Sequence, residues 1–286
     1  MNWFLFRQQK QIELSEHYDD GEAKRILQIL AEELLPHYSQ FDLRNPAFNL
    51  NKEDLILLNK RLVRLSKGEP LQYVLEKAWF YNMELKVNDT VLIPRPETEE
   101  LVHWIIQDWK EEEVSVLDIG TGSGCIPMAI GDNIPHAEIH AIDVSEDALQ
   151  LAQLISCEQR INIQFQQIDI LDRNQWSKLG SFDVIVSNPP YIPNSEKGKM
   201  KAHVLDYEPH LALFVEDHDP LIFYKEICSF AHKHLKANGS LYFECNEFNA
   251  KDVVTHLKNN GFKNTHLKKD LQGKNRMIKA SFSGQK

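Results

Sequence analysis

A regular alternation of strand-like and helix-like segments beyond residue 113 constrains the fold more than any other feature of the sequence. The strand-like runs are short and apolar, and most are followed by a longer stretch with helical spacing of its apolar residues. These runs are residues 114–119, 137–143, 161–169, 182–187 and 239–245. We therefore predict an α/β fold with a parallel, doubly wound sheet that binds its ligand at the carboxyl ends of the strands.

Two further apolar runs, residues 262–267 and 277–282, lie near the end of the chain. The loop between them is rich in Lys, Asp and Gly, and it is too short for the crossover that parallel strands require. We expect these two runs to pair as antiparallel strands.

Residues 1–75 follow a helical pattern instead. Apolar residues repeat at spacings of three and four from Ala23 to Leu35, and Pro36 ends this helix. A second helix begins after Asn51, a favourable N-cap residue, and ends at Gly68. We predict a small helical domain over residues 1–75 that serves packing or substrate recognition.

Residues 76–95 change to strand-like spacing, with Asn88 and Asp89 between two apolar runs at 80–87 and 91–93. This pattern predicts a β-hairpin linker with its turn at those two residues. Acidic residues at 97–100 then suit the first turn of a helix. The main domain is therefore predicted to span residues 96–286. Arg95 and Glu97, at its start, suit either a structural ion pair or the wall of a substrate cleft.

Composition argues against several classes of protein. The net charge of −10 disfavours a protein that binds nucleic acid through phosphate neutralisation. No apolar run approaches the roughly 18 residues of a membrane span, so we expect a soluble, cytoplasmic protein. The four cysteines form no CxxC pair and the histidines have no metal-ligand spacing. We expect buried free thiols, solvent-facing histidines and no metal.

A glycine-rich turn follows the first strand-like run and consists of Gly120, Thr121, Gly122, Ser123 and Gly124. Glycines let the backbone turn sharply and let a ligand approach the main chain closely. Position 125 is Cys rather than the last glycine of a dinucleotide fingerprint, and no Gly-Lys-Ser/Thr sequence of a P-loop is present. This contracted spacing is typical of methyltransferases that bind S-adenosylmethionine (AdoMet).

Acidic residues end the next two strand-like runs. Asp143 is placed to accept hydrogen bonds from ribose hydroxyls, and Asp169 with the backbone amide of Ile170 is placed to meet an adenine edge. Together with the glycine-rich turn, these strand ends predict a nucleoside-binding site.

The fourth strand-like run ends in Asn188, Pro189, Pro190 and Tyr191. The two prolines restrict the backbone and remove two N–H donors, so the corner presents mainly acceptors. The Asn188 side-chain oxygen and the Pro189 carbonyl can accept both hydrogens of a planar NH2 group, while Tyr191 offers a flat face. This arrangement directs the nitrogen lone pair of an amide or adenine acceptor at an electrophilic methyl group.

Several separate stretches resemble the peptide chain release factor glutamine methyltransferases, the HemK-like family. They are Gly-Glu-Pro-Leu-Gln-Tyr at 68–73, Ile-Pro-Arg-Pro-Glu-Thr-Glu at 93–99, the glycine turn at 117–124, Ile-Val-Ser-Asn-Pro-Pro-Tyr-Ile at 185–192, Glu-Pro at 208–209 with Ala-Leu-Phe at 212–214, and Lys-Asp-Leu-Gln-Gly at 269–273 before Arg276.

The resemblance implies a Rossmann-like, seven-stranded class I methyltransferase domain behind a small helical domain and a hairpin linker. It implies methylation of the glutamine in the Gly-Gly-Gln loop of class 1 release factors, with S-adenosylhomocysteine as product. Residues 120–124, Asp143, Ile170 and Asn188 are then expected to bind AdoMet, and residues 188–191 to hold the glutamine. We expect a monomer.

Other substrates suit the same corner. The alternatives are glutamine in a ribosomal protein, adenine in nucleic acid, and a non-catalytic AdoMet-binding regulator. The acidic net charge and the absence of a basic, aromatic-interleaved segment disfavour nucleic acid, and an intact acceptor corner disfavours a regulator.

Overall fold

The computed structural model describes residues 1–282, which belong to two compact units. The first unit contains Met1–Glu76 and Lys201–Tyr207, and the second contains Lys77–Met200 and the residues from Glu208 onward. The short segment Lys201–Tyr207 thus groups with the amino-terminal residues although it lies far from them in the sequence. Its Tyr207 hydroxyl donates a hydrogen bond to the carbonyl of Lys67 at 2.8 Å.

The first unit is helical, as predicted. Its helices are α1 (Trp3–Leu14), α2 (Asp20–Leu34), α3 (Gln40–Arg44), α4 (Lys52–Leu65), α5 (Leu71–Leu75) and α9 (Ala202–Tyr207). The N-cap prediction for α4 is confirmed, since Asn51 Oδ1 accepts a hydrogen bond from the backbone N–H of Asp54 at 2.8 Å. One core with Trp3, Phe6 and Leu30 in its interior joins α1 to α5, whereas α9 contributes no buried residue.

The second unit begins with a hairpin whose turn differs from the predicted one. Strands β1 (Lys77–Phe80) and β2 (Met83–Lys86) pair antiparallel with Phe80 opposite Met83. The turn therefore lies at Tyr81 and Asn82, which both have positive φ, and the prediction of a turn at Asn88 and Asp89 is wrong. Positive φ at both central residues matches the right-handed twist of a two-residue hairpin.

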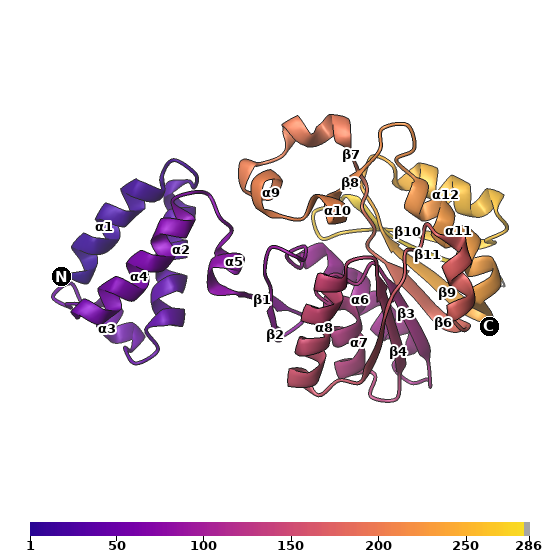
Figure 1. Ribbon diagram of the computed structural model, residues 1–286, viewed down its shortest axis with the longest axis horizontal. Coiled ribbons are helices and arrows are strands. Elements are labelled where there is room, and N and C mark those ends of the chain that lie inside the picture. Colours follow the sequence, from indigo (N-terminus) through magenta and orange to yellow (C-terminus); the bar gives the residue numbers. More distant parts are fainter. Residues whose placement is uncertain (283–286) are drawn as a thin grey trace. The chain divides into compact units, whose positions relative to one another are not determined.

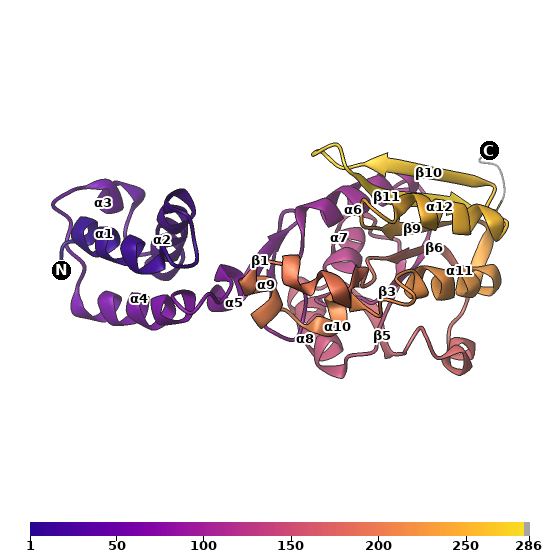
Figure 2. The same ribbon diagram turned by 90° about the horizontal axis from the view of Figure 1, so that it is seen from above.

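Seven strands form the main sheet: β3 (Ser115–Ile119), β4 (Glu138–Asp143), β5 (Ile163–Gln167), β6 (Phe182–Ser187), β9 (Leu235–Glu244), β10 (Asn264–Lys269) and β11 (Asn275–Ser281). Their order is β10-β11-β9-β6-β3-β4-β5. The five strands from β9 to β5 run parallel, whereas β11 and β10 add antiparallel at one edge. Figure 2 shows β10 at that edge. The predicted parallel sheet and antiparallel last pair are both confirmed.

The remaining elements of this unit are α6 (Pro96–Trp109), α7 (Cys125–Asn133), α8 (Glu146–Gln159), η1 (Arg173–Lys178), β7 (Ile192–Pro193), η2 (Asn194–Lys199), α10 (His210–Leu213), β8 (Phe214–Val215), α11 (Ile222–His234) and α12 (Ala250–Asn259). Figure 1 shows α6, α7 and α8 on one side of the sheet and α11 and α12 on the other.

Alternate residues along a strand face opposite sides of the sheet, so each strand contributes side chains to the cores on both faces. Leu117 and Ile119 belong to the core that includes α11 and α12, whereas Val116 belongs to the core that includes α6, α7 and α8. The near-continuous apolar character of β3 follows from this burial on both faces.

The cysteines are free, and the expectation that all are buried is only partly correct. Cys228 and Cys245 are buried, but Cys157 is exposed. In α8 the buried residues include Ile155 and Ser156, and Cys157 lies on the outer face of the helix. No helix within residues 1–282 combines the length and apolarity that a membrane crossing requires.

Candidate active site

The register of the sheet brings the glycine-rich turn and the Asn188 corner to neighbouring strand ends. Ile119 of β3 lies opposite Ser187 of β6, and the Ser187 hydroxyl donates a hydrogen bond to the Ile119 carbonyl at 2.7 Å. Gly120 and Asn188 are the next residues on these two strands. The parallel register alone therefore sets the two motifs side by side.

A pocket opens at these strand ends. Ten of the predicted site residues line it: Gly120, Thr121, Gly122, Ser123, Asp143, Asp169, Ile170, Asn188, Pro189 and Pro190. Further lining residues include Arg95, Thr98, Leu211 and Phe223. Neither Gly124 nor Tyr191 is among the lining residues.

The glycine-rich turn presents bare backbone to the pocket. Gly120 and Gly122 have positive φ, at 74° and 52°, and a Cβ built on either would meet no heavy atom within 4 Å. Beside them the buried Thr121 hydroxyl has no hydrogen-bond partner in the described part of the chain. Open backbone beside an unsatisfied hydroxyl fits a polar ligand that approaches the main chain closely.

Gly124 has a different task. Its φ is 76°, and a Cβ there would come within 3.1 Å of Ala152 Cβ and 3.3 Å of Met128 Cε. The absence of a side chain at this position lets the start of α7 pack closely against α8.

Asp143 lies at the end of β4 and braces the glycine-rich turn. Its Oδ2 accepts a hydrogen bond from the Gly122 N–H at 2.8 Å, and its Oδ1 accepts one from the Ser145 N–H at 2.9 Å. Burial raises the pKa of this carboxyl group, and the backbone donors partly offset that effect. Each carboxylate oxygen retains a second lone pair for a ligand.

Asp169 and Ile170 follow β5. Asp169 Oδ1 accepts a hydrogen bond from the Leu171 N–H at 2.9 Å, and the Ile170 carbonyl accepts one from the Trp176 indole at 2.9 Å. These bonds fix the loop that forms this wall of the pocket.

Asp118 was not predicted as a site residue, although it lies only two residues before the glycine-rich turn. Its side chain is fully buried, and neither carboxylate oxygen has a hydrogen-bond partner among residues 1–282. Burial raises its pKa to about 7. An acidic residue at a strand end beside glycines was the available signal in the sequence.

The Asn188 side chain is held on one side only. Its Nδ2 donates a hydrogen bond to Thr98 Oγ1 at 3.2 Å, and no described residue donates to its Oδ1. The Thr98 hydroxyl in turn donates to Glu244 Oε2 at 2.6 Å. No role was assigned to Thr98 or Glu244 from the sequence, although Thr98 lies in the stretch at 93–99 and Glu244 lies at the end of β9.

Tyr191 packs inward. It is half-buried and lies against the core that includes α11 and α12, and burial raises its pKa. Its ring supports the corner from behind in this structure.

Arg95 pairs with Glu208, and this pairing was not predicted from the sequence. Its guanidinium contacts both carboxylate oxygens of Glu208, at 2.6 and 2.7 Å, and the Glu208 side chain is only 1% exposed. Glu208 also accepts a hydrogen bond from the Ile93 N–H. Arg95 therefore lines the pocket while it anchors the Glu-Pro stretch at 208–209, and the suggested Arg95–Glu97 ion pair is not formed.

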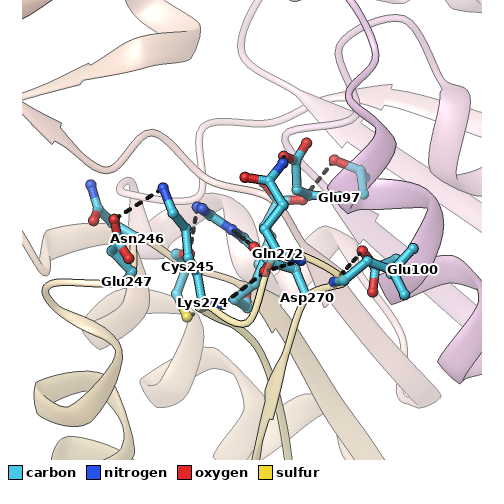
Figure 3. A network of polar contacts seen from close by, with 12 residues as sticks. Glu97, Glu100, Cys245, Asn246, Glu247, Asp270, Gln272 and Lys274 are labelled. Atoms are coloured by element: carbon cyan, nitrogen blue, oxygen red, sulfur yellow. Dashed lines mark hydrogen bonds and ion pairs between the residues drawn. The ribbon is translucent and has the colours of Figure 1, made fainter.

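The loop between β10 and β11 is anchored by a polar network, shown in Figure 3. Asp270 accepts hydrogen bonds from the backbone N–H groups of Gln272 and Lys274, at 3.0 and 2.8 Å. Glu97 and Glu100 of α6 bind the same loop through the Gln272 side chain and the Leu271 N–H. This network joins the antiparallel edge of the sheet to the first turns of α6.

The histidines take no part in this pocket, and residues 1–282 contain no cluster of three or more His, Cys, Asp or Glu side chains able to hold a metal ion.

Known proteins resemble this chain over most of its length. A family model described as "Methyltransferase domain" matches residues 110–284. A release factor glutamine methyltransferase of Flavobacterium psychrophilum is 42% identical over 94% of this chain and 95% of its own. A protein of the same name from Bacteroides thetaiotaomicron is 41% identical over 78% of this chain and 80% of its own.

Among solved structures, the hMettl16 catalytic domain in complex with the MAT2A 3′UTR hairpin 6 has a TM-score of 0.55 and 16% identity, over 83% of this chain and 84% of that one. At this identity the likeness supports the fold, and it agrees with the Rossmann-like methyltransferase sheet. The two relatives support more, because they match both in identity and in length. The chain belongs to the family of release factor glutamine methyltransferases.

Proposed function

We propose that this protein transfers a methyl group from AdoMet to the side-chain amide nitrogen of the glutamine in the Gly-Gly-Gln loop of class 1 release factors, leaving S-adenosylhomocysteine. The observation that carries the proposal is the held orientation of the Asn188 amide. Its nitrogen is engaged by Thr98, so its oxygen remains for a substrate in a pocket shared with the glycine-rich turn.

The pocket suits the cofactor in its chemistry. AdoMet, when bound, supplies an electrophilic methyl group on a sulfonium sulfur. The open backbone at Gly120 and Gly122 accommodates a close approach, and the remaining lone pairs of Asp143 can accept hydrogen bonds from ribose hydroxyls. Asp169 and Ile170 form the wall proposed for the adenine.

A glutamine side chain is a poor nucleophile because its nitrogen lone pair is delocalised into the carbonyl group. Asn188 Oδ1 and the carbonyl oxygen of Pro189 are proposed to accept its two N–H hydrogens. Acceptance of both hydrogens orients the amide plane and stabilises the positive charge that develops on nitrogen as the new N–C bond forms. The product cation then loses its proton to water, so no general base is required.

Recognition of the whole release factor is proposed to depend on residues 1–75, a helical domain that contributes nothing to the pocket described above. We further propose that the protein acts as a monomer in the cytoplasm, where release factors encounter the ribosome. The acidic net charge of −10 supports a protein substrate over nucleic acid.

Label transfer tests the proposal. The purified protein is incubated with methyl-tritiated AdoMet and a class 1 release factor, and in parallel with the same factor carrying Ala in place of the loop glutamine. We expect label in the first factor only. Equal label in both factors, or label in added ribosomal protein or nucleic acid alone, would contradict the assigned substrate.

A further inference from the structure

A short chain of hydrogen bonds runs behind the Asn188 corner, away from the pocket. Asn188 Nδ2 donates to Thr98 Oγ1 at 3.2 Å, and Thr98 Oγ1 donates to Glu244 Oε2 at 2.6 Å. Thr98 and Glu244 are both buried, at 2% exposure each. Three residues from segments far apart in the sequence thus meet at one point.

The geometry of the sheet explains how Glu244 reaches this point. Ser187 of β6 lies opposite Phe243 of β9, so the next residues along these parallel strands are Asn188 and Glu244. Thr98 comes from the first turn of α6, where Pro96 begins the helix. The chain of hydrogen bonds therefore depends on a strand register and on the placement of one helix.

The hydrogen count fixes the direction of the chain. A threonine hydroxyl has one hydrogen to donate, and an ionised carboxylate can only accept. The Thr98 hydrogen is committed to Glu244, so the Thr98 oxygen can only accept from its other neighbour. The NH2 end of the Asn188 amide can supply that hydrogen and its oxygen end cannot. When Glu244 is ionised, the Asn188 amide therefore keeps Nδ2 toward Thr98 and presents Oδ1 to the NH2 group that is to be methylated.

Basic groups favour the ionised form of Glu244. Burial is the main reason that its pKa is raised to about 7, and Glu97 adds to this effect; the Thr98 hydrogen bond and the positive charges of Arg276 and Arg95 lower the pKa and so keep it from rising further. Arg276 is itself held, because its Nε lies 3.3 Å from Asp270 Oδ2 and its Nη1 donates to the Cys245 carbonyl at 3.2 Å. Figure 3 shows Asp270 and Cys245 in this surrounding network.

The contacts of Arg276 indicate a structural role for residues 269–276, the stretch that contains both Asp270 and Arg276. Asp270 accepts hydrogen bonds from the loop backbone as well as from Arg276. It therefore sets Arg276 beside the end of β9, where the guanidinium offsets the charge of buried Glu244.

We propose that Thr98 and Glu244 are positioning residues for methyl transfer, which act through Asn188 by presenting its amide oxygen to the acceptor amide. Arg276 supports them as the counter-charge of Glu244. The inference rests on the proposed function only in requiring an acceptor with an NH2 group, and it holds for any such acceptor that the protein methylates.

Substitution of Thr98 tests the proposal. Thr98→Val keeps the shape of the side chain but has no hydroxyl, so the Asn188 amide loses its orienting partner. We expect kcat to fall about tenfold to 100-fold while KM for the acceptor and Kd for AdoMet change by less than about threefold. Thr98→Ser restores the hydroxyl and is expected to recover most of the lost kcat.

Thr255→Val is the matched control, since Thr255 is exposed on α12, outside the pocket, and its hydroxyl donates to the Lys251 carbonyl of the same helix. All variants are compared at equal folded fraction, from thermal unfolding and AdoMet titration. A kcat for Thr98→Val within about twofold of wild type, or a Thr98→Ser variant as impaired as Thr98→Val, would overturn the proposal. Failure of wild-type protein to label the release factor would instead refute the substrate assignment, and the same comparison would proceed on the acceptor that is labelled.

Discussion

The two halves of the pocket are built in contrasting ways. The glycine-rich half offers backbone: Gly120 and Gly122 leave its surface open, and Asp143 braces the turn through main-chain N–H groups. The Asn188 half relies on a side chain whose orientation is set by Thr98 and Glu244, which lie far from it in the sequence on either side. The first half consists of a local turn that a residue at the end of the neighbouring strand β4 supports, whereas the second half depends on side chains from α6 and β9.

The comparison predicts that the two halves can be damaged separately. Asn188→Ala removes the proposed acceptor oxygen, so we expect kcat to fall by about 10²- to 10³-fold, the usual loss for one transition-state hydrogen bond. AdoMet affinity, measured by calorimetry, should change by less than about threefold. Wild-type kcat in this variant would refute the role of the corner.

Gly122→Val should damage the other half. Its side chain would occupy the open face of the turn at a backbone position with φ of 52°, which β-branched residues disfavour. We expect AdoMet to bind about 10- to 100-fold more weakly, with a smaller change in kcat at saturating AdoMet. Gly180→Val is the control, because Gly180 is exposed and its Cβ would meet open space without positive φ. Equal AdoMet affinity in the Gly122 and Gly180 variants would contradict the assignment of the turn.

Asn188→Asp sharpens the comparison further. The aspartate oxygens can still accept from the substrate amide, but neither can donate to Thr98. We expect kcat to fall by about 20-fold, less than for Asn188→Ala, because half of the arrangement survives. If folded Asn188→Asp had a lower kcat than Asn188→Ala, a hydrogen-bond acceptor at position 188 would not be enough to explain the activity.

The pH dependence gives the smallest expected effect. Glu244 has a pKa raised to about 7, so it is ionised above that pH and protonated below it. When protonated, Glu244 can donate to Thr98, which frees the Thr98 hydrogen and permits the opposite Asn188 orientation. We therefore expect kcat to fall about tenfold between pH 8 and pH 6. The other titratable groups near Glu244 are Arg276 of β11, Arg95, Glu97 of α6, Tyr191, Tyr224 of α11, Cys125 and Cys245.

Glu244→Gln separates this effect from titration of those groups and of the substrate. Glutamine at 244 does not titrate in this range, and like protonated Glu244 its side chain can both accept from Thr98 and donate to it. The variant should therefore have about the kcat of the wild-type protein at pH 6, at every pH, and should lose the decline below pH 7. An unchanged pH profile in Glu244→Gln would assign the decline to another group.

Local patterns predicted the fold well because each strand and helix carries its own signal. The runs that became β3 to β6 are apolar by themselves, and the short loop before Asn275 was sufficient to require an antiparallel edge. The hairpin turn was misplaced because Asn88 and Asp89 are the stronger turn residues, whereas Tyr81 and Asn82 adopt positive φ under the packing of Phe80 and Met83.

The residues of the candidate site also differ in whether a local sequence pattern could identify them. Gly120 and Asn188 follow strand-like runs and Asp143 ends one, and all three were found from that position. Thr98 reads in the sequence as an ordinary residue of a first helical turn, and its role appears only when α6 packs beside β9. The ion pair of Glu208 with Arg95 can likewise be recognised only from the folded chain.

A high-resolution crystal structure of the protein with S-adenosylhomocysteine and a peptide containing Gly-Gly-Gln tests the central claim most directly. The account predicts that the glutamine Nε2 lies about 3 Å from Asn188 Oδ1 and that Asn188 Nδ2 still donates its hydrogen bond to Thr98 Oγ1. A glutamine nitrogen outside the pocket, or an Asn188 amide with its nitrogen toward the peptide, would contradict it.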